Sequence, residues 1–319
     1  MTRLRYRPSA GAVIPAFFLS HEAIILSISL IDKKQETIIV HNPTYKGISS
    51  KALNLLRVEC NDSSTVLDME VTGPPKNWVR LKSSIKLVTE NNQEFKTLGV
   101  KGLELDKECY LPESGKIRFS LIFEPLPSNT KSFHFLEGNK KGDWEIIGIR
   151  LTDELPKGYF RYTLKGEIPT SAFDGKQFRI HRYSNGYTLG RITVEGNQFE
   201  YHGIADSAMF CRIDIGQHFG NFIIEEGTVN IDMTTWMYPS GTPLNEDLSE
   251  LSRLRDKVGT MIDSIRQSII QGKMDRETRI KKLEEIEFNR DVQRKIKKEL
   301  IKPFILKHSN DEAGAVAVQ

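Results

Sequence analysis

The sequence has few cysteines, and none of them stand at a spacing that supports thiol or zinc chemistry. The three are Cys60, Cys109 and Cys211. A dithiol redox site needs a low-pKa thiolate with a resolving partner one turn away, and zinc sites need clustered cysteines and histidines. Neither pattern is present in the sequence. Cys60 and Cys109 could form a disulfide in an oxidising compartment, but we favour the alternative that all three are small buried hydrophobic residues.

The chain also lacks the short motifs that mark common catalytic sites. It contains no G-x-S-x-G elbow, no H-E-x-x-H zinc motif and no glycine-rich phosphate loop before a helix. The GNKKGD segment (138–143) lies between two predicted strands, which favours a hairpin turn over a phosphate site. Glu225 and Glu226 are adjacent in an extended segment, so their carboxylates point to opposite faces and cannot act as a paired acid and base.

The seven histidines are scattered along the chain. His181 and His202 lie in separate predicted strands and could approach each other, with His218 nearby in sequence. This leaves a histidine- or metal-dependent enzyme as an alternative. No spacing requires a metal, however, and we favour structural or solvent-facing histidines. We therefore predict no catalytic, cofactor-binding or metal-binding residues, no cofactor, and a protein that is not an enzyme.

The chain has little excess of either charge sign, since its formal net charge is only +3. The charge therefore indicates no particular partner. Residues 273–307 contain twelve Lys or Arg and seven Asp or Glu, and the two signs interleave at helical spacing. A solvated, salt-bridged helix explains this pattern better than a surface for nucleic acid or anionic membrane, which would need a stripe of one sign. We therefore expect no nucleic-acid partner.

Long uninterrupted apolar runs are also missing. The stretch from Ala10 to Ile31 is mostly apolar, but a proline, a histidine and Glu22 interrupt it. Signal peptides and membrane spans both need cleaner runs. Residues 1–22 are therefore an ambiguous N-terminal segment, either a degraded export signal or a lead into a first strand at 23–31. We expect no integral membrane span.

What the sequence does contain is a series of short strand-like segments over residues 23–154. Ile117, Phe119, Leu121 and Phe123 alternate with other residues, which is the period-two pattern of a strand with one apolar face. Regular short strands separated by turn residues are typical of a β-sandwich, here an immunoglobulin-like one. The segments are IILSISLI, ETIIVH, TVLDMEV, WVRLKSSIKLV, IRFSLIFEPL, SFHFLEG and WEIIGIRLT.

A second β-rich region follows residues 155–158, whose proline and glycine indicate a domain boundary. Phe160, Tyr162 and Leu164 alternate again, and further short strands follow with asparagine–glycine and glycine–asparagine turns between them. We predict a smaller antiparallel β-domain over 159–243. The fold class is therefore mainly β, with two antiparallel β-sandwich-like domains followed by an α-helical hairpin.

The helical hairpin or linker is predicted over 244–307. Thr242, followed by a proline, provides an N-cap and a first helical residue. Gly272 ends the first helix, Asp275 caps the second, and Pro303 ends it. The first helix carries an apolar seam at four-three spacing, interrupted only by an arginine, which predicts packing along its whole length inside the protomer. A dimeric coiled coil is the alternative. The seam residues are Leu244, Leu248, Leu251, Val258, Ile262, Ile265 and Ile269.

The second region resembles a known family. From Tyr159 the chain reads YFRYTLKGEI, and later FIIEEGTVNI and GTPLNEDL. This block resembles the β-rich domain of unknown function that precedes a thioredoxin-like (AhpC/TSA, TlpA-type) domain in bacterial envelope proteins of the thiol:disulfide interchange kind. The segment TVLDMEVTGPPKNWVRL is similar to an immunoglobulin-like module found ahead of that family's domains. The tail at 308–319 resembles the start of the last linker before the thioredoxin-like domain, so we expect a truncated or split chain that lacks the redox domain.

The resemblance implies a non-catalytic accessory or partner-recognition region of an envelope protein, located in the cell envelope or periplasm. Its expected partner is a thioredoxin-like domain or an envelope client. One alternative is a small-ligand or glycan-binding β-sandwich, in which exposed aromatic residues stack on the ligand. The candidates for such stacking are Trp78, Trp144, Trp236 and the nine tyrosines. The histidine-dependent enzyme is the other alternative.

Overall fold

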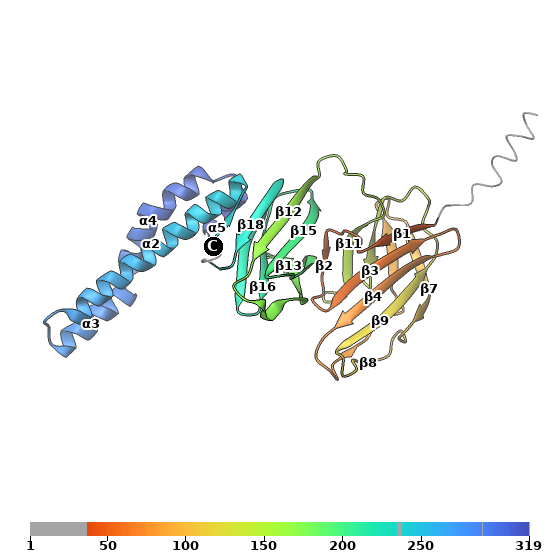
Figure 1. Ribbon diagram of the computed structural model, residues 1–319, viewed down its shortest axis with the longest axis horizontal. Coiled ribbons are helices and arrows are strands. Elements are labelled where there is room, and N and C mark those ends of the chain that lie inside the picture. The colour runs from red at the N-terminus through yellow and green to blue at the C-terminus, as the bar shows by residue number, and fades with distance from the viewer. Residues whose placement is uncertain (1–36, 235–237, 289, 319) are drawn as a thin grey trace, which may run out of the picture.

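The computed structural model describes residues 37–234, 238–288 and 290–318 (Figure 1). The ambiguous segment 1–22 and the alternative first strand at 23–31 lie outside the described residues. The architecture is mainly β, with large antiparallel sheets followed by a cluster of helices, as the sequence predicts.

Short strands fill the first half of the chain, as the regular alternation of apolar residues predicts. They are β1 (Ile38–His41), β2 (Gly47–Ile48), β3 (Leu53–Cys60), β4 (Thr65–Thr72), β5 (Trp78–Val79), β6 (Lys86–Thr89), β7 (Glu94–Lys101), β8 (Cys109–Tyr110), β9 (Lys116–Phe123), β10 (Ser132–Leu136) and β11 (Glu145–Arg150).

The strands of the first half enclose one apolar core. Their order is β1-β3-β4-β9-β7-β6-β10-β11, and neighbouring strands are antiparallel. Leu67 on β4 and Phe123 on β9 belong to the same buried cluster as Phe133 and Phe135 on β10. The two halves of this strand order therefore pack against each other across the core, as in a sandwich.

The second half has its own set of strands and a short 3-10 helix at Ser171–Phe173. The strands are β12 (Phe160–Glu167), β13 (Gln177–Arg182), β14 (Thr188–Thr193), β15 (Gln198–Ala205), β16 (Met209–Ile215), β17 (His218–Ile224), β18 (Gly227–Asp232) and β19 (Pro239–Ser240).

Two groups of strands enclose a second core. Strands β14, β13, β16 and β17 form one group, and β15, β12, β18 and β19 form a separate four-stranded sheet. Side chains alternate along β16, so that Met209, Cys211, Ile213 and Ile215 are buried between the groups. Strands β12 and β18 pair in parallel, which differs from the antiparallel neighbours on either side.

The short strand β2 joins the two halves. It pairs with β11 of the first half at Ile48 and with β14 of the second half at the same residue, opposite Thr188. The hydrogen-bonded order therefore runs without a break through thirteen strands, from β1 to β17. The two apolar cores remain separate clusters on either side of this junction.

The helices follow the second half and extend away from the sheets (Figure 1). The first helix begins after Thr242 and ends before Gly272, as predicted, and Asp275 caps the second through its Oδ1 atom, which accepts the Thr278 N–H at 2.8 Å. The helices are α2 (Pro243–Gln271), α3 (Arg276–Phe288), α4 (Arg290–Lys307) and α5 (Glu312–Val318).

One prediction about the helices is wrong. Pro303 does not end the second helix, because α4 contains it and continues to Lys307. Burial of Ile301 and Phe304 against α2 and α5 outweighs the lost backbone hydrogen bond. A further short helix, α5, follows α4.

Among its described side chains, the predicted seam of α2 is fully buried only near the start of the helix. Leu248 and Leu251 are buried against Ile223 of β17 and against α4 and α5. Ile265 is 38% exposed, because this part of α2 extends beyond the sheets and contacts only other helices (Figure 1). The side chains of Val258 and Ile262 lie outside the described residues.

Candidate functional site

The three histidines singled out by the sequence do not converge. His181 is buried on β13 with its Nε2 atom 3.7 Å from Asp214, and burial lowers its pKa. His202 lies on β15 of the other sheet, where its Nδ1 atom is 3.1 Å from the Thr163 hydroxyl. His218 packs edge-on against an aromatic ring. Within the described residues, no group of three or more His, Cys, Asp or Glu side chains could hold a metal ion.

All three cysteines are free thiols, so the disulfide between Cys60 and Cys109 is not formed. Burial raises the pKa of the Cys60 thiol to about 11. Burial also raises the pKa of Cys211, which lies in the second core. Both thiols are therefore protonated at neutral pH, and they behave as small apolar residues.

The GNKKGD loop and Glu225 each have a structural role. The GNKKGD segment connects β10 to β11, and the Lys140 N–H bonds to the carboxylate of Asp143 at 3.0 Å, so the predicted hairpin turn is confirmed. Glu225 accepts hydrogen bonds from Asn245 at the start of α2, whereas Glu226 is exposed. Glu225 therefore anchors a helix.

The tryptophans do not gather at one place that the structure describes. Trp78 is 57% exposed on β5, and Trp144 packs partly buried against the first core. Trp236 lies outside the described residues. A tryptophan platform for a sugar is therefore not assembled by Trp78 and Trp144.

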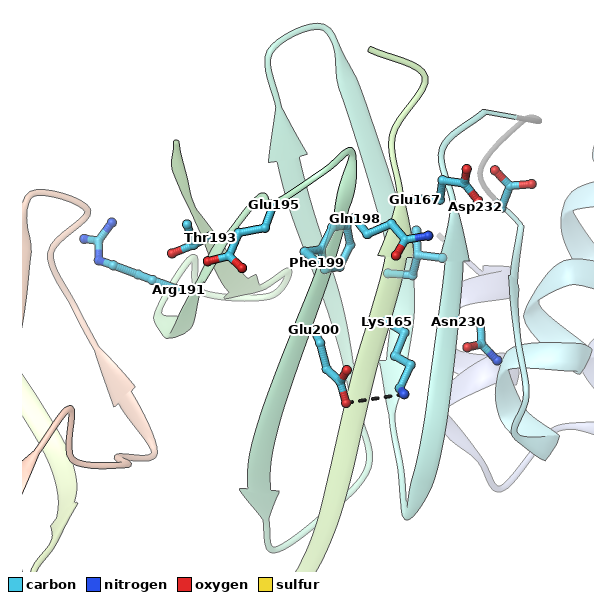
Figure 2. A pocket seen from close by; sticks show the side chains of 12 residues that line it. Lys165, Glu167, Arg191, Thr193, Glu195, Gln198, Phe199, Glu200, Asn230 and Asp232 are labelled. Carbon is cyan, nitrogen blue, oxygen red and sulfur yellow. Dashed lines mark ion pairs between the residues drawn. The ribbon is translucent and has the colours of Figure 1, made fainter. Parts of the chain in front are cut away.

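A broad polar groove of about 710 Å³ lies over the four-stranded sheet (Figure 2). Lys165 on β12 and Glu200 on β15 form a cross-strand ion pair at 3.3 Å at one end of it. Glu167 and Asp232 lie close together at the other end (Figure 2). The sequence did not reveal this cluster, because it depends on the register of β12 with β15 on one side and with β18 on the other. More carboxylates than basic groups line the groove, which gives it a local negative charge.

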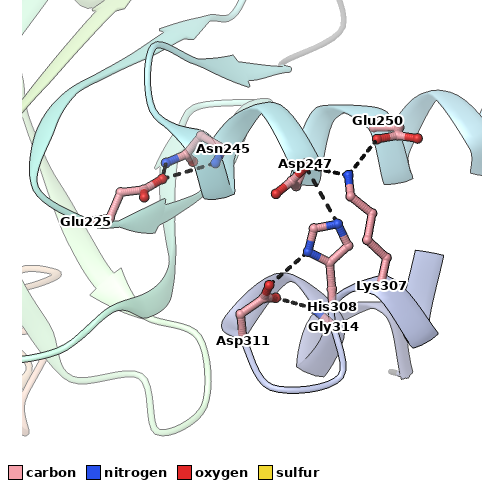
Figure 3. Close-up of polar contacts among 8 residues, drawn as sticks. All are labelled: Glu225, Asn245, Asp247, Glu250, Lys307, His308, Asp311 and Gly314. Atoms are coloured by element: carbon pink, nitrogen blue, oxygen red, sulfur yellow. Dashed lines mark hydrogen bonds and ion pairs between the residues drawn. The ribbon is translucent and has the colours of Figure 1, made fainter.

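Buried polar contacts fix the helices to the second β region (Figure 3). Asn245 is fully buried and bonds to both the N–H and the carbonyl of Ile223, at 2.8 and 2.7 Å. His308 is also buried, with Nδ1 2.8 Å from Asp311 and Nε2 3.6 Å from Asp247. We call residues 243–307 the helical arm. These contacts hold the base of the helical arm in place.

The far part of the helical arm exposes large apolar side chains. Met261 and Ile265 are 43% and 38% exposed, and they share one face of α2 because they are four residues apart. Ile270 near the end of α2 and Ile280 on α3 are also exposed. We call these four residues the arm-tip residues. Adjacent exposed apolar side chains, such as Met261 and Ile265 one turn apart, are typical of interaction surfaces.

The comparisons with known proteins point to the second region. Residues 162–248 match the family model of a domain of unknown function, DUF4369. The match begins in β12, includes the second β core and ends in the first turns of α2. The search of curated proteins finds no match to the chain. Among the described residues, no helix is both long enough and apolar enough to cross a membrane.

Proposed function

We propose that the chain is a non-catalytic accessory region of a thiol:disulfide interchange-type envelope protein. In this proposal its helical arm binds a thioredoxin-like domain or an envelope client of one. The family-model match over 162–248 supports the view that the second β region is a domain of unknown function. The partner and the location in the cell envelope or periplasm follow from the resemblance described above.

The observation that carries the proposal is the exposure of the arm-tip residues. Ile265 and Ile280 are 38% and 46% exposed. The base of α2, in contrast, buries Leu251 completely. The base of α2 therefore packs onto its own protein, whereas the apolar residues farther along α2 remain available to a second protein. Burial of such side chains on binding contributes favourable free energy in proportion to the apolar area removed from water.

The chemistry of the thiols fits a non-catalytic role for this region. Reduction of a disulfide requires a thiolate, and burial keeps the Cys60 pKa at about 11. In the proposal, redox chemistry belongs to the thioredoxin-like partner. The arm provides a semi-rigid connection between that partner and the β regions.

The proposal is tested by calorimetric titration of the chain with a purified TlpA-type thioredoxin-like domain. Wild type should bind, and Ile265→Asp and Ile280→Asp should each weaken the dissociation constant by about tenfold or more, because each places a charge in an apolar interface. Gln267→Asp is the matched control, since it adds the same charge at an exposed position of α2.

Three outcomes would contradict the proposal. The first is that wild type does not bind the thioredoxin-like domain. The second is that the control weakens binding as much as the arm-tip variants do. The third is that the arm-tip variants bind as tightly as wild type. Sedimentation velocity of the same proteins measures their oligomeric state. A wild-type dimer that Ile265→Asp converts to a monomer would make the arm tip a contact between two copies of this chain.

A further inference from the structure

A second cavity lies at the junction of the two β regions, well away from the arm tip. Its volume is about 340 Å³. The loop before β2 and strand β11 contribute residues from the first half, and β12, β14 and β15 contribute residues from the second. Cavities between two structural units are common places for small-molecule sites. Neither the sequence motifs nor the family match assigns a role to this one.

Tyrosine rings form much of the wall of the junction cavity. Tyr162 and Tyr201 lie with their ring centroids 6.1 Å apart, and Tyr162 is buried. Burial raises the pKa of Tyr45 to about 12, so its phenol stays neutral and able to donate a hydrogen bond. Tyr159 and Tyr187 also line the cavity. Flat apolar surfaces with neutral hydroxyl groups at their edges suit an aromatic ligand.

Most charged groups at the cavity already have partners. The Lys46 ammonium is 2.9 Å from Asp206 and lies over the Tyr159 ring, 5.0 Å from its centroid. Glu90 accepts a hydrogen bond from Ser132. Arg150 donates to the backbone carbonyls of residues 152 and 154. These groups shape the cavity, and they do not leave a free charge for a ligand.

Arg182 is the exception. Its side chain is half-buried and lines the cavity, and its guanidinium has no hydrogen-bond or ion-pair partner among the residues that the structure describes. An arginine fork binds a carboxylate through two parallel hydrogen bonds. Because only one cation is unpaired and Glu90 and Asp206 are nearby, a singly charged carboxylate fits this cavity better than a phosphate.

From this geometry we infer that the junction cavity binds a small aromatic carboxylate, with its ring against the tyrosine side chains that line the cavity and its carboxylate on Arg182. The mouth is accessible, since Lys46, Asn185 and Asp206 at the rim are exposed while Met209 and Ile224 on other parts of the wall are buried. The site does not involve the arm tip, so it stands independently of the proposed partner.

The test uses two probes of nearly equal shape, naphthalene-2-carboxylate and naphthalene-2-carboxamide, titrated into the full chain by calorimetry. Wild type should bind the carboxylate about tenfold more tightly than the amide, or better, because a charge-assisted hydrogen bond is stronger than a neutral one. Arg182→Gln should remove this preference, and Arg182→Lys should restore part of it. Arg80→Gln is the control, since it removes the same charge from an exposed position outside the cavity.

The inference is overturned if wild type binds neither probe, or if Arg182→Gln keeps the preference for the carboxylate. If Arg182→Gln and Arg80→Gln lose the preference for the carboxylate equally, the preference is a general effect of net charge, and the inference is also overturned. Thermal unfolding of each variant confirms that the protein is folded under the conditions of the titration. If Arg182→Gln does not fold, Arg182→Lys carries the test, because a planar fork should bind a carboxylate more tightly than an ammonium does.

Discussion

A single hydrogen bond links the protonation of His134 to the pairing of β10 with β11. The His134 Nδ1 atom accepts the Gly148 N–H at 2.9 Å, which requires that this nitrogen carry no proton. Burial and the nearby Lys46 ammonium lower the His134 pKa from its ordinary value of 6.5, although Glu90 and Glu145 oppose the shift. The folded protein therefore favours the neutral ring.

This arrangement predicts a loss of stability in mild acid. As the pH falls below 6.5, the unfolded chain takes up the proton first, so the free energy of unfolding decreases until the lower folded pKa is passed. Melting temperatures measured from pH 7.5 to pH 5.5 should therefore fall less in His134→Gln than in wild type. His202→Gln, at an exposed position, is the control. An unchanged slope in His134→Gln would contradict the prediction.

Single residues also show a limit of reading the sequence. Gly203 lies opposite Tyr162 across β12 and β15, and a Cβ atom on Gly203 would lie 2.3 Å from that ring. Gly166 lies opposite Phe199 in the same way. The alternation along Phe160–Leu164 predicted the strand correctly. The glycine–aromatic pairs could not be predicted, because they depend on cross-strand register, which alternation alone does not define.

At the level of elements, the start of α2 depends on one buried side chain. Asn245 accepts the Ile223 N–H and donates to the Ile223 carbonyl, the Thr242 hydroxyl and the Glu225 carboxylate. In this way one amide satisfies two backbone groups of β17 and fixes the helix against the sheet. Figure 3 shows its contacts with Glu225. The cap at Thr242 contributes through its contact with Asn245, since its side chain caps no backbone N–H of the helix.

Replacing Asn245 with alanine should therefore destabilise the second β region. The change leaves the Ile223 N–H and carbonyl without their side-chain partner, and a buried unsatisfied group costs about 1–3 kcal/mol. Urea unfolding should show a lower free energy of unfolding for Asn245→Ala. Lys257→Ala, exposed on the same helix, should unfold as wild type does. Equal stability of Asn245→Ala and wild type would show that α2 does not need this anchor.

Elements with strong patterns were predictable, and elements defined by packing were not. The start of α2 follows from a proline in its first turn and its end from Gly272, and the strand at Ile117–Phe123 follows from alternation. Strand β7 was missed because a bulge between Thr97 and Gly99 breaks its alternation, so that Phe95 and Val100 both pack against the first core although they are five residues apart. The path of α4 through Pro303 was missed because tertiary burial decides it. The partial burial of the α2 seam could not be predicted either, since heptad spacing does not say where the partner surface ends.

For the whole molecule, the boundary at 155–158 separates two cores that remain hydrogen-bonded through β2. Lys157 and Gly158 are exposed, which fits a connection that a protease can reach. The junction between the regions is built from several contacts. Arg191 donates to the carbonyls of Lys51 and Leu53 at 3.0 and 3.1 Å, and Tyr187 donates to Glu145. Sequence composition indicated where the connection lies, but it contained no signal for a strand shared between the two regions.

Cutting the connection should therefore leave the two regions associated. A protease site inserted between Lys157 and Gly158 would produce fragments 1–157 and 158–319. These should elute together in gel filtration at micromolar concentration, because the pairing of β2 with β14 and the Arg191 contacts cross the cut. Arg191→Ala should promote separation, since it removes two hydrogen bonds to backbone carbonyls across the cut. Arg179→Ala is the control and should not, because its guanidinium bonds to the Gly186 carbonyl within the second fragment. If the wild-type fragments separate in buffer as soon as the chain is cut, the thirteen-stranded order does not hold the halves together, and the covalent connection does.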